Sequence, residues 1–170
     1  MSALVMRLEG PLQAWGVDGA QLIRRTHLHP QKRAVLGLIR AAKGLSRDET
    51  WDALDDLSFQ VRVLKRPRRM WDFAGVRNTI SADGKFLHKQ RVLNREYLAD
   101  AAFLVALEGE SDLLEEVRSA LRCPVFLLGL GRRDCPASYP IFFSLSDDSS
   151  EVALEKAEEW IRVSKTQISI

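Results

Sequence analysis

The sequence predicts a single α+β domain of the ferredoxin-like class, with the element order β-α-β-β-α-β. Apolar segments of strand length alternate with two segments of helical periodicity. The length of 170 residues suits one ordinary domain spanning 1–170. A basic insertion, at about 66–95, separates the second strand from the third. RNA-recognition modules share this fold with many unrelated proteins, so the fold alone assigns no function.

The first 44 residues are predicted to form a strand, a loop and a helix. Apolar residues fill most of 2–9, which indicates a buried strand, and Gly10-Pro11 breaks it. A polar loop follows as far as Pro30. Residues 31–43 carry apolar side chains at helical spacing, and Gly44 is placed to end the helix.

The next elements lead into the basic insertion. Residues 46–49 form a capping-box pattern before a short acidic helix. Apolar and polar residues alternate over 59–63, which is typical of a half-buried strand. Asp83-Gly84 is a hairpin-turn signal, so 66–95 is predicted to be a β-hairpin that projects from the core. A connection of about thirty residues is rare in a compact domain unless it is functional or disordered.

The second half of the chain is predicted to complete the sheet and its helices. Strands are expected at 97–107, 125–130 and 141–145, and helices at 111–121 and 151–162. Ser111 is the expected cap of the first of these helices. Gly131-Arg132-Arg133 is expected to form a turn directly after the strand at 125–130.

The net charge of +2 conceals a strong segregation of charge along the chain. Residues 22–47 include seven basic side chains and no acidic one, and 62–95 include ten basic side chains against two acidic ones. The acids gather elsewhere, at 48–56, 108–116 and 147–159. Aromatic residues also lie among the cations of the second basic segment, which argues against a merely solvated face. This pattern predicts a phosphate-binding surface.

Composition argues against several other classes of protein. No apolar run approaches the roughly 20 residues of a membrane-spanning helix. The N-terminus lacks the basic start and long apolar stretch of a signal peptide, so a cytoplasmic protein without a membrane partner is expected. Two cysteines are too few for a disulfide framework. No His or Cys pair has metal-ligand spacing, and neither a metal nor a cofactor is expected.

Four short segments carry a family resemblance. They are Leu8-Glu9-Gly10-Pro11-Leu12-Gln13-Ala14-Trp15-Gly16, then Arg25-Thr26 with Pro30-Gln31-Lys32 and Val35-Leu36-Gly37-Leu38-Ile39, then Arg95-Glu96-Tyr97-Leu98-Ala99-Asp100-Ala101-Ala102-Phe103, and finally Leu130-Gly131-Arg132-Arg133-Asp134-Cys135-Pro136 with Pro140. In this order they resemble the CasD family, the RAMP-type subunit of type I-E CRISPR Cascade complexes. The resemblance spans roughly residues 4–143.

The resemblance implies a non-catalytic subunit that caps the 5′ handle of the CRISPR RNA (crRNA) and holds it as a single strand. It also implies a thumb, here the basic hairpin, against the neighbouring Cascade backbone subunit. A further expected partner is the large subunit that reads the target DNA, so this chain would meet target DNA only indirectly. Two departures stand out. The family's usual Ser-Gly after the helix-leading lysine is Arg33-Ala34 here, and its Arg-Pro-Thr is Arg24-Arg25-Thr26.

Fourteen residues are expected to bind RNA. They are Gln13, Trp15, Gly16, Arg24, Arg25, Lys32, Arg33, Arg68, Arg69, Arg77, Lys89, Arg91, Arg132 and Arg133. Trp15 can stack on a splayed base, or it is simply a lid on the core. The cations around the start of the first helix lie where its dipole favours phosphate. The guanidinium groups of the turn after 125–130 can fork onto phosphate oxygens. For both sets of cations, ordinary surface charge is the alternative.

Two other functions remain open at this point. A metal-independent crRNA-processing endoribonuclease needs a general acid or base and a cation near the scissile phosphate. His27, His29, Lys32 and Tyr97 supply groups of that kind. A ferredoxin-like module that serves protein assembly alone is the third class, with its basic hairpin docked on an acidic partner.

Overall fold

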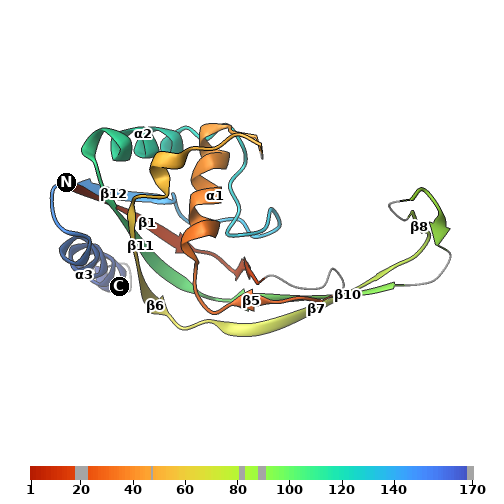
Figure 1. Cartoon of the computed structure of the whole chain (residues 1–170). Coiled ribbons are helices and arrows are strands. Elements are labelled where there is room, and N and C mark those ends of the chain that lie inside the picture. The colour runs from red at the N-terminus through yellow and green to blue at the C-terminus, as the bar shows by residue number, and fades with distance from the viewer. Residues whose placement is uncertain (18–22, 47, 81–82, 88–90, 168–170) are drawn as a thin grey trace.

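A computed structural model describes residues 1–17, 23–46, 48–80, 83–87 and 91–167. It has a body made of one antiparallel sheet and three helices, from which a long two-stranded arm extends (Figure 1). No helix in these ranges is both long and apolar enough to span a membrane.

Four strands form the sheet of the body. They are β1 (Ser2–Glu9), β6 (Ser58–Lys65), β11 (Ala102–Gly109) and β12 (Phe142–Ser146). Their order is β12-β1-β11-β6, and each neighbouring pair is antiparallel. The central strand β1 pairs with β11 over its whole length, from Ser2 opposite Gly109 to Glu9 opposite Ala102. The prediction of a strand at 2–9 is confirmed.

Helices cover both faces of this sheet. They are α1 (Lys32–Lys43), α2 (Ser111–Arg122) and α3 (Ser150–Gln167). Successive side chains of a strand point to opposite faces. Leu4 and Met6 therefore join the core under α1 and α2, whereas Ala3 and Val5 pack with residues of α3. Burial on both faces explains why β1 is almost continuously apolar, as is typical of a central strand between two layers.

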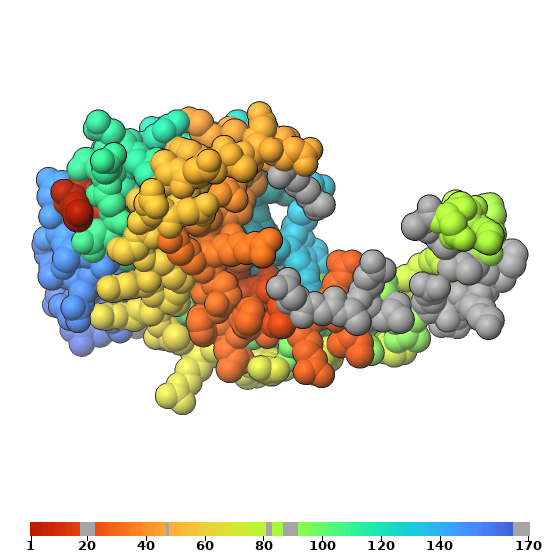
Figure 2. Space-filling model, in the orientation of Figure 1, coloured from red at the N-terminus to blue at the C-terminus, as the bar shows by residue number. Residues whose placement is uncertain are grey.

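The arm consists of the segment between β6 and β11. Its strands are β7 (Arg68–Val76), β8 (Thr79–Ile80), β9 (Phe86–Leu87) and β10 (Arg91–Ala99). β7 and β10 pair antiparallel along nine residues each, and β8 pairs with β9 at the tip, where Gly84 has a φ of +79°. The arm thus follows the hairpin pairing expected from Asp83-Gly84. Figure 2 shows its tip standing clear of the body.

Four very short strands join the arm to the body. They are β2 (Leu12–Gln13), β3 (Trp15–Gly16), β4 (Ile23–Arg24) and β5 (Thr26–His27). β2 and β4 both pair with β10, and β3 pairs with β5. The loop predicted between Gly10 and Pro30 is therefore partly built into the root of the arm.

Two of the predicted strands are wrong in their extent or existence. The strand predicted at 97–107 is divided between β10 and β11 by a turn, in which Asp100 has a φ of +54° and donates its N–H to the Pro11 carbonyl at 3.0 Å. Aspartate tolerates this left-handed conformation better than most residues. The segment 125–130 is not a strand. It follows Pro124 as an extended loop, and the place beside β1 is taken by β12.

Two predicted caps also differ from the structure. The cap of α2 is Glu110, and the Ser111 hydroxyl instead contacts the Ser2 hydroxyl at 2.7 Å. The Glu49 carboxylate accepts the Ser46 N–H at 2.7 Å, as in a capping box, but no α-helix begins there. Only a 3-10 turn at Asp52–Leu54 follows.

Candidate nucleic-acid interface

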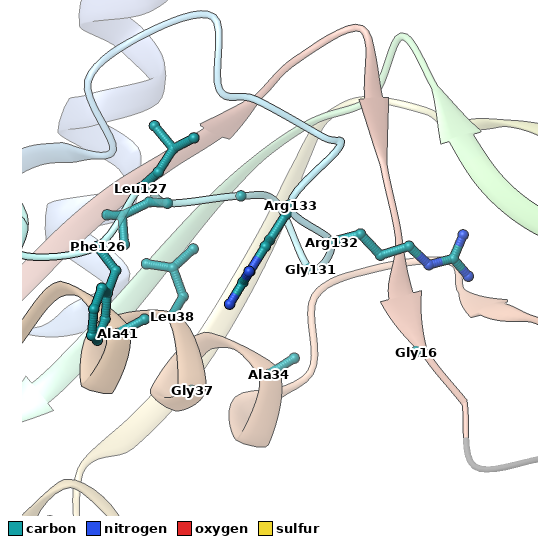
Figure 3. A pocket seen from close by; sticks show the side chains of 12 residues that line it. Gly16, Ala34, Gly37, Leu38, Ala41, Phe126, Leu127, Gly131, Arg132 and Arg133 are labelled. Carbon is teal, nitrogen blue, oxygen red and sulfur yellow. The ribbon is translucent and has the colours of Figure 1, made fainter. Parts of the chain in front are cut away.

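A cleft of about 320 Å³ lies between α1 and the loop that follows α2 (Figure 3). Its lining consists of Gly16, Ala34, Gly37, Leu38, Ala41, Phe126, Leu127, Leu128, Gly129, Gly131, Arg132 and Arg133. The helix contributes small side chains, so a ligand can approach its backbone closely. An adjoining hollow of about 470 Å³ shares part of this lining, including Arg133. Both hollows lie along α1 and share Gly37, Ala41, Phe126 and Arg133, and we call the two together the groove.

Glycines shape the turn that carries the two arginines. Gly131 has a φ of +88°, and a Cβ there would lie 1.8 Å from the Ala14 carbonyl oxygen. A Cβ on Gly129 would lie 2.1 Å from the carbonyl oxygen of Arg132. Leu130 between them is fully buried, and its carbonyl accepts the Ala14 N–H at 3.0 Å. Only glycine fits both positions, and the buried leucine fixes the turn to the body.

The two arginines of this turn point in different directions. In Figure 3 the Arg133 side chain extends toward α1, and Arg132 extends away from it, past Gly16. The Arg132 guanidinium lies over the Tyr97 ring at 4.7 Å and donates to the Arg24 carbonyl at 3.3 Å. Arg133 is exposed at the groove, which leaves its donors accessible to an anion.

The carboxylate of Asp134 holds Tyr97 in place beneath the Arg132 guanidinium. The Tyr97 hydroxyl donates to Asp134 Oδ2 at 2.7 Å, and Arg95 Nη1 lies 4.0 Å from the same oxygen. The hydrogen bond from Tyr97 is the main reason why the pKa of Asp134 lies below its ordinary value. This hydrogen bond holds the Tyr97 ring under the Arg132 guanidinium, and the ring in turn fixes the position of that guanidinium.

Gln13 and Trp15 were expected to contact RNA, but they lie inside the protein. The Gln13 amide donates to the carbonyls of Leu8 and Ala101 at 3.0 and 2.9 Å, and its oxygen accepts the Trp15 indole N–H at 3.0 Å. The indole is fully buried. Trp15 therefore cannot stack on a base in this structure, and it serves as part of the core. Gly16, the next residue, does line the cleft.

A buried carboxylate that sequence reasoning missed ties the arm to the body. Glu96 is fully buried, and its two oxygens accept the Thr26 N–H at 2.9 Å and the Arg69 guanidinium at 2.7 Å. The Thr26 hydroxyl in turn accepts the Trp15 N–H at 2.7 Å. The signal in the sequence was an acid directly after Arg95, at the end of the basic segment. It indicates an internal ion pair rather than a solvated charge.

The remaining cations near α1 occupy its exposed N-terminal side. Arg24, Arg25 and Arg33 are exposed. Lys32 donates to the Asp55 carbonyl at 2.5 Å, so part of its capacity is used within the protein. Gln31 caps α1 without a side-chain hydrogen bond, and the first turn contains no acid. The local field there favours an anion.

The cations of the arm lie apart from the cleft. Arg68 forms an ion pair with Asp100, and Arg69 forms one with Glu96. Arg77 is exposed just after β7, and Arg91 begins β10. Lys89 lies outside the described residues.

Some of the groups considered for an endoribonuclease form hydrogen bonds within the protein. Tyr97 is buried, and its hydroxyl is bound to Asp134. His29 contacts the Gln31 amide through Nδ1 at 3.1 Å, whereas His27 is exposed on β5. Within the described ranges, no group of three or more His, Cys, Asp or Glu residues is arranged to hold a metal ion.

Known proteins resemble this chain over most of its length. The family model described as CRISPR-associated protein (Cas_Cas5) matches residues 3–165. The CRISPR system Cascade subunit CasD of Escherichia coli K12 is 33% identical over 157 residues, which cover 83% of this chain and 70% of that protein. A solved chain of a CRISPR RNA-guided surveillance complex superposes with a TM-score of 0.80 at 28% identity, over 91% of this chain and 66% of its own length.

A second solved structure, described as a Cas protein, gives a TM-score of 0.70 at 36% identity and covers 90% of this chain and 69% of that one. This chain thus spans about two thirds of the length of the relatives that it matches. The family match, the identity to CasD and the two superpositions all point in the same direction. The chain belongs to the Cas5 family of CRISPR-associated proteins, of the CasD type.

Proposed function

We propose that this protein is a non-catalytic crRNA-binding subunit of a CRISPR Cascade complex and caps the 5′ handle of the crRNA. The observation that carries the proposal is the cleft between α1 and the glycine turn, with Arg132 and Arg133 at its edge. The relative that is a Cascade subunit and the neighbour from an RNA-guided complex support the setting.

The chemistry of the cleft suits a bent sugar-phosphate chain. Its volume of about 320 Å³ falls at the lower end of small-ligand pockets, so it has room for roughly one nucleotide. Arg133 can fork onto two phosphate oxygens, and Arg132 is held in place by Tyr97. Gly16 and Gly37 leave space for close approach, since a Cβ at either position would meet nothing within 4 Å.

The same proposal includes a ferredoxin-like topology for the body, a thumb role for the arm and contacts with other Cascade subunits. The strand order β12-β1-β11-β6 with antiparallel pairing supports a ferredoxin-like assignment of the body, and the arm would be its thumb. As a Cascade subunit in the cytoplasm, the protein would contact the backbone and large subunits, and target DNA only through them. RNA would be held rather than cut; of the groups considered for catalysis, Tyr97 is buried and its hydroxyl is bound to Asp134, whereas His27 is exposed.

The test replaces both arginines of the turn. Arg132→Ala/Arg133→Ala in a complex co-expressed with its neighbouring subunits should retain at least about tenfold less crRNA than wild type, because charge-assisted contacts to phosphate are lost. Arg118→Ala/Arg122→Ala removes the same charge from α2 and should retain crRNA normally. Equal retention in both variants would refute the assignment of the cleft. Site-specific cleavage of repeat RNA by the purified chain would establish the endoribonuclease alternative instead.

A further inference from the structure

One face of the arm exposes two large aromatic side chains next to each other. Trp71 is 53% exposed and Phe73 is 70% exposed, and both belong to β7. They are two residues apart, so their side chains leave the strand on the same face, about 6.8 Å apart along it. Exposure of two adjacent aromatic rings is costly in water and calls for a ligand.

The strand register shows which residues share this face. Asn94 of β10 lies opposite Phe73, and Ile23 of β4 lies opposite Asn94. Directly paired residues project from the same side of a sheet, so Ile23, Asn94 and Phe73 form one row across the strands. Trp71 lies beside this row on the same face, opposite the buried Glu96. We call the four residues Ile23, Trp71, Phe73 and Asn94 the platform. Ile23 is 44% exposed.

The other face of the same strands is occupied differently. Arg95 and Asp72 are paired there, and so are Tyr97 and Met70. Tyr97 is covered by Arg132, and Arg95 lies near Asp134. That face therefore turns toward the glycine turn of the cleft. The platform occupies the opposite face of the arm, which is exposed at Trp71 and Phe73 but buried at Glu96, where Thr26 and Arg69 contact the carboxylate.

Charge and spacing favour nucleobases as the ligand of the platform. The arm, 66–101, includes eight basic side chains against four acidic ones, so it carries a net positive charge that attracts a polyanion. Aromatic rings at alternate positions of a strand are the arrangement on which single-stranded nucleic acids stack successive bases. The Asn94 amide adds a donor and an acceptor beside the rings. The Arg69 side chain, two residues before Trp71, is held by Glu96 yet remains half exposed for a phosphate.

We propose that the platform is a second RNA-binding surface, on which two unpaired bases stack against Trp71 and Phe73. This inference rests on the proposed function and extends it, because β4 links the platform to the turn beside the cleft. Ile23 precedes Arg24 in β4, and the Arg24 carbonyl accepts the hydrogen bond from Arg132. A single strand leaving the cleft can thus pass the edge of the arm root and reach the platform.

The test measures binding of a fluorescently labelled oligouridine of ten nucleotides by anisotropy, with the full chain. Trp71→Ala/Phe73→Ala should weaken binding at least about tenfold, because two base-stacking contacts are lost. Trp71→Phe should stay within about threefold of wild type, since a phenyl ring also stacks. Trp160→Ala is the matched control, because Trp160 is 59% exposed but lies on α3, and it should bind as wild type does.

Tryptophan emission gives an independent reading of the same contact. Unlabelled oligouridine should quench the emission of Trp160→Phe, which keeps Trp71. It should leave the emission of Trp71→Phe nearly unchanged, because no stacked indole remains. Unchanged circular dichroism spectra are expected for all variants, and Trp160→Ala should melt at a somewhat lower temperature, because the Trp160 ring packs against Phe143 at 5.4 Å.

The outcomes separate this inference from the proposed function. Normal RNA binding by Trp71→Ala/Phe73→Ala, with a loss in Arg132→Ala/Arg133→Ala, would overturn the platform and leave the cleft in place. Normal RNA binding combined with failure to assemble with neighbouring subunits would identify the platform as a protein contact and also overturn it. If wild type and the control bind no RNA, alone or in the complex, the proposed function fails as well.

Discussion

Gly131 determines how two arginines are presented at the cleft, although it donates no side chain of its own. Its φ is +88°, and a Cβ at this position would lie 1.8 Å from the Ala14 carbonyl oxygen, which excludes any larger residue without a shift of the turn. Gly131→Ala should therefore lower the free energy of unfolding by about 2 kcal/mol or more, through backbone strain and the clash.

Urea unfolding followed by circular dichroism measures this change. Gly16→Ala is the matched control, because a Cβ there meets no atom within 4 Å and the backbone is not left-handed. The control should change the free energy of unfolding by no more than about 0.5 kcal/mol. A Gly131→Ala variant as stable as the control would show that the turn adapts easily.

A second residue-scale prediction concerns acid stability. The hydrogen bond from Tyr97 is the first cause of the lowered pKa of Asp134, so the folded state favours the ionised carboxylate. Such a group stabilises the protein above the pKa of the unfolded state, about 3.9, and this stabilisation is lost as the pH falls through the folded-state pKa. The melting temperature of Tyr97→Phe should therefore fall less between pH 7 and pH 3 than that of wild type.

The comparison of variants is needed because other carboxylates also titrate in this window. The pKa of Asp100 is lowered mainly by the hydrogen bond from Arg68, and the pKa of Glu108 mainly by the Ser150 N–H. Tyr139→Phe is the control, because Tyr139 is exposed and its ring packs against the Arg7 guanidinium instead. The same acid-induced loss in Tyr97→Phe and wild type would contradict the role given to this hydrogen bond.

The exposure of an individual site residue could be predicted from the sequence only where the rest of the fold does not decide it. Arg132 and Arg133 line the cleft on the turn expected at Gly131, although no strand precedes that turn, and their binding of RNA stays a prediction. Trp15 was not predictable in this way. Whether an indole after a Gly-Pro break is buried or exposed depends on contacts that the local sequence does not show, here the hydrogen bond to Gln13 and the turn at the distant Gly131.

Among the elements, those with strong internal periodicity were predicted well. The helix expected at 31–43 forms as α1 and ends at Gly44, which is left-handed with a φ of +87°. The helix expected at 111–121 forms as α2. The segment 125–130 has the same apolar composition as a buried strand, yet it lines the cleft, because the sheet edge beside β1 is filled by β12. Local composition does not show which of two apolar segments takes the place beside β1 in the sheet.

The arm should be separable from the body at its outer half. Phe73 and Asn94 are directly paired, so residues 74–93 can be replaced by an Asn-Gly turn without changing the register of the root. The buried contacts of Glu96 and Tyr97 remain in this variant. Its free energy of unfolding should fall by no more than about 1 kcal/mol, because the removed part buries little apolar surface.

Assembly should respond more strongly than stability. The deletion removes basic residues of the arm, including Arg77 and Arg91, so the co-expressed complex should retain less crRNA at its 5′ end. Size-exclusion chromatography with quantification of bound RNA measures this. A variant that folds, assembles and holds crRNA like wild type would show that the outer arm is not a functional thumb.

At the scale of the whole molecule, α3 decides which surfaces are available to RNA. Side chains of Ala153, Leu154, Ala157 and Ile161 pack on the sheet face that many RNA-recognition modules leave open. Under the proposed function, RNA would therefore be bound at the groove along α1 and at the arm. The segregation of cations in the sequence predicts this arrangement only in part, because it does not reveal that the second face is covered.

Binding spread over the groove and the arm should depend steeply on salt. If about six phosphates are neutralised, the logarithm of the affinity for single-stranded RNA should fall with the logarithm of the salt concentration at a slope of roughly −4, since each contact with a single strand contributes about 0.7. Arg132→Ala/Arg133→Ala should make this slope shallower by about 1.4, because two phosphate contacts are lost. Arg118→Ala/Arg122→Ala carries the same net charge but lies on α2, so it should keep the wild-type slope. Anisotropy titrations over roughly 50 to 400 mM salt, on the chain and on the assembled complex, measure all three slopes. A salt-independent affinity, or the same change of slope in both double variants, would mean that RNA is not held by the cations of this groove.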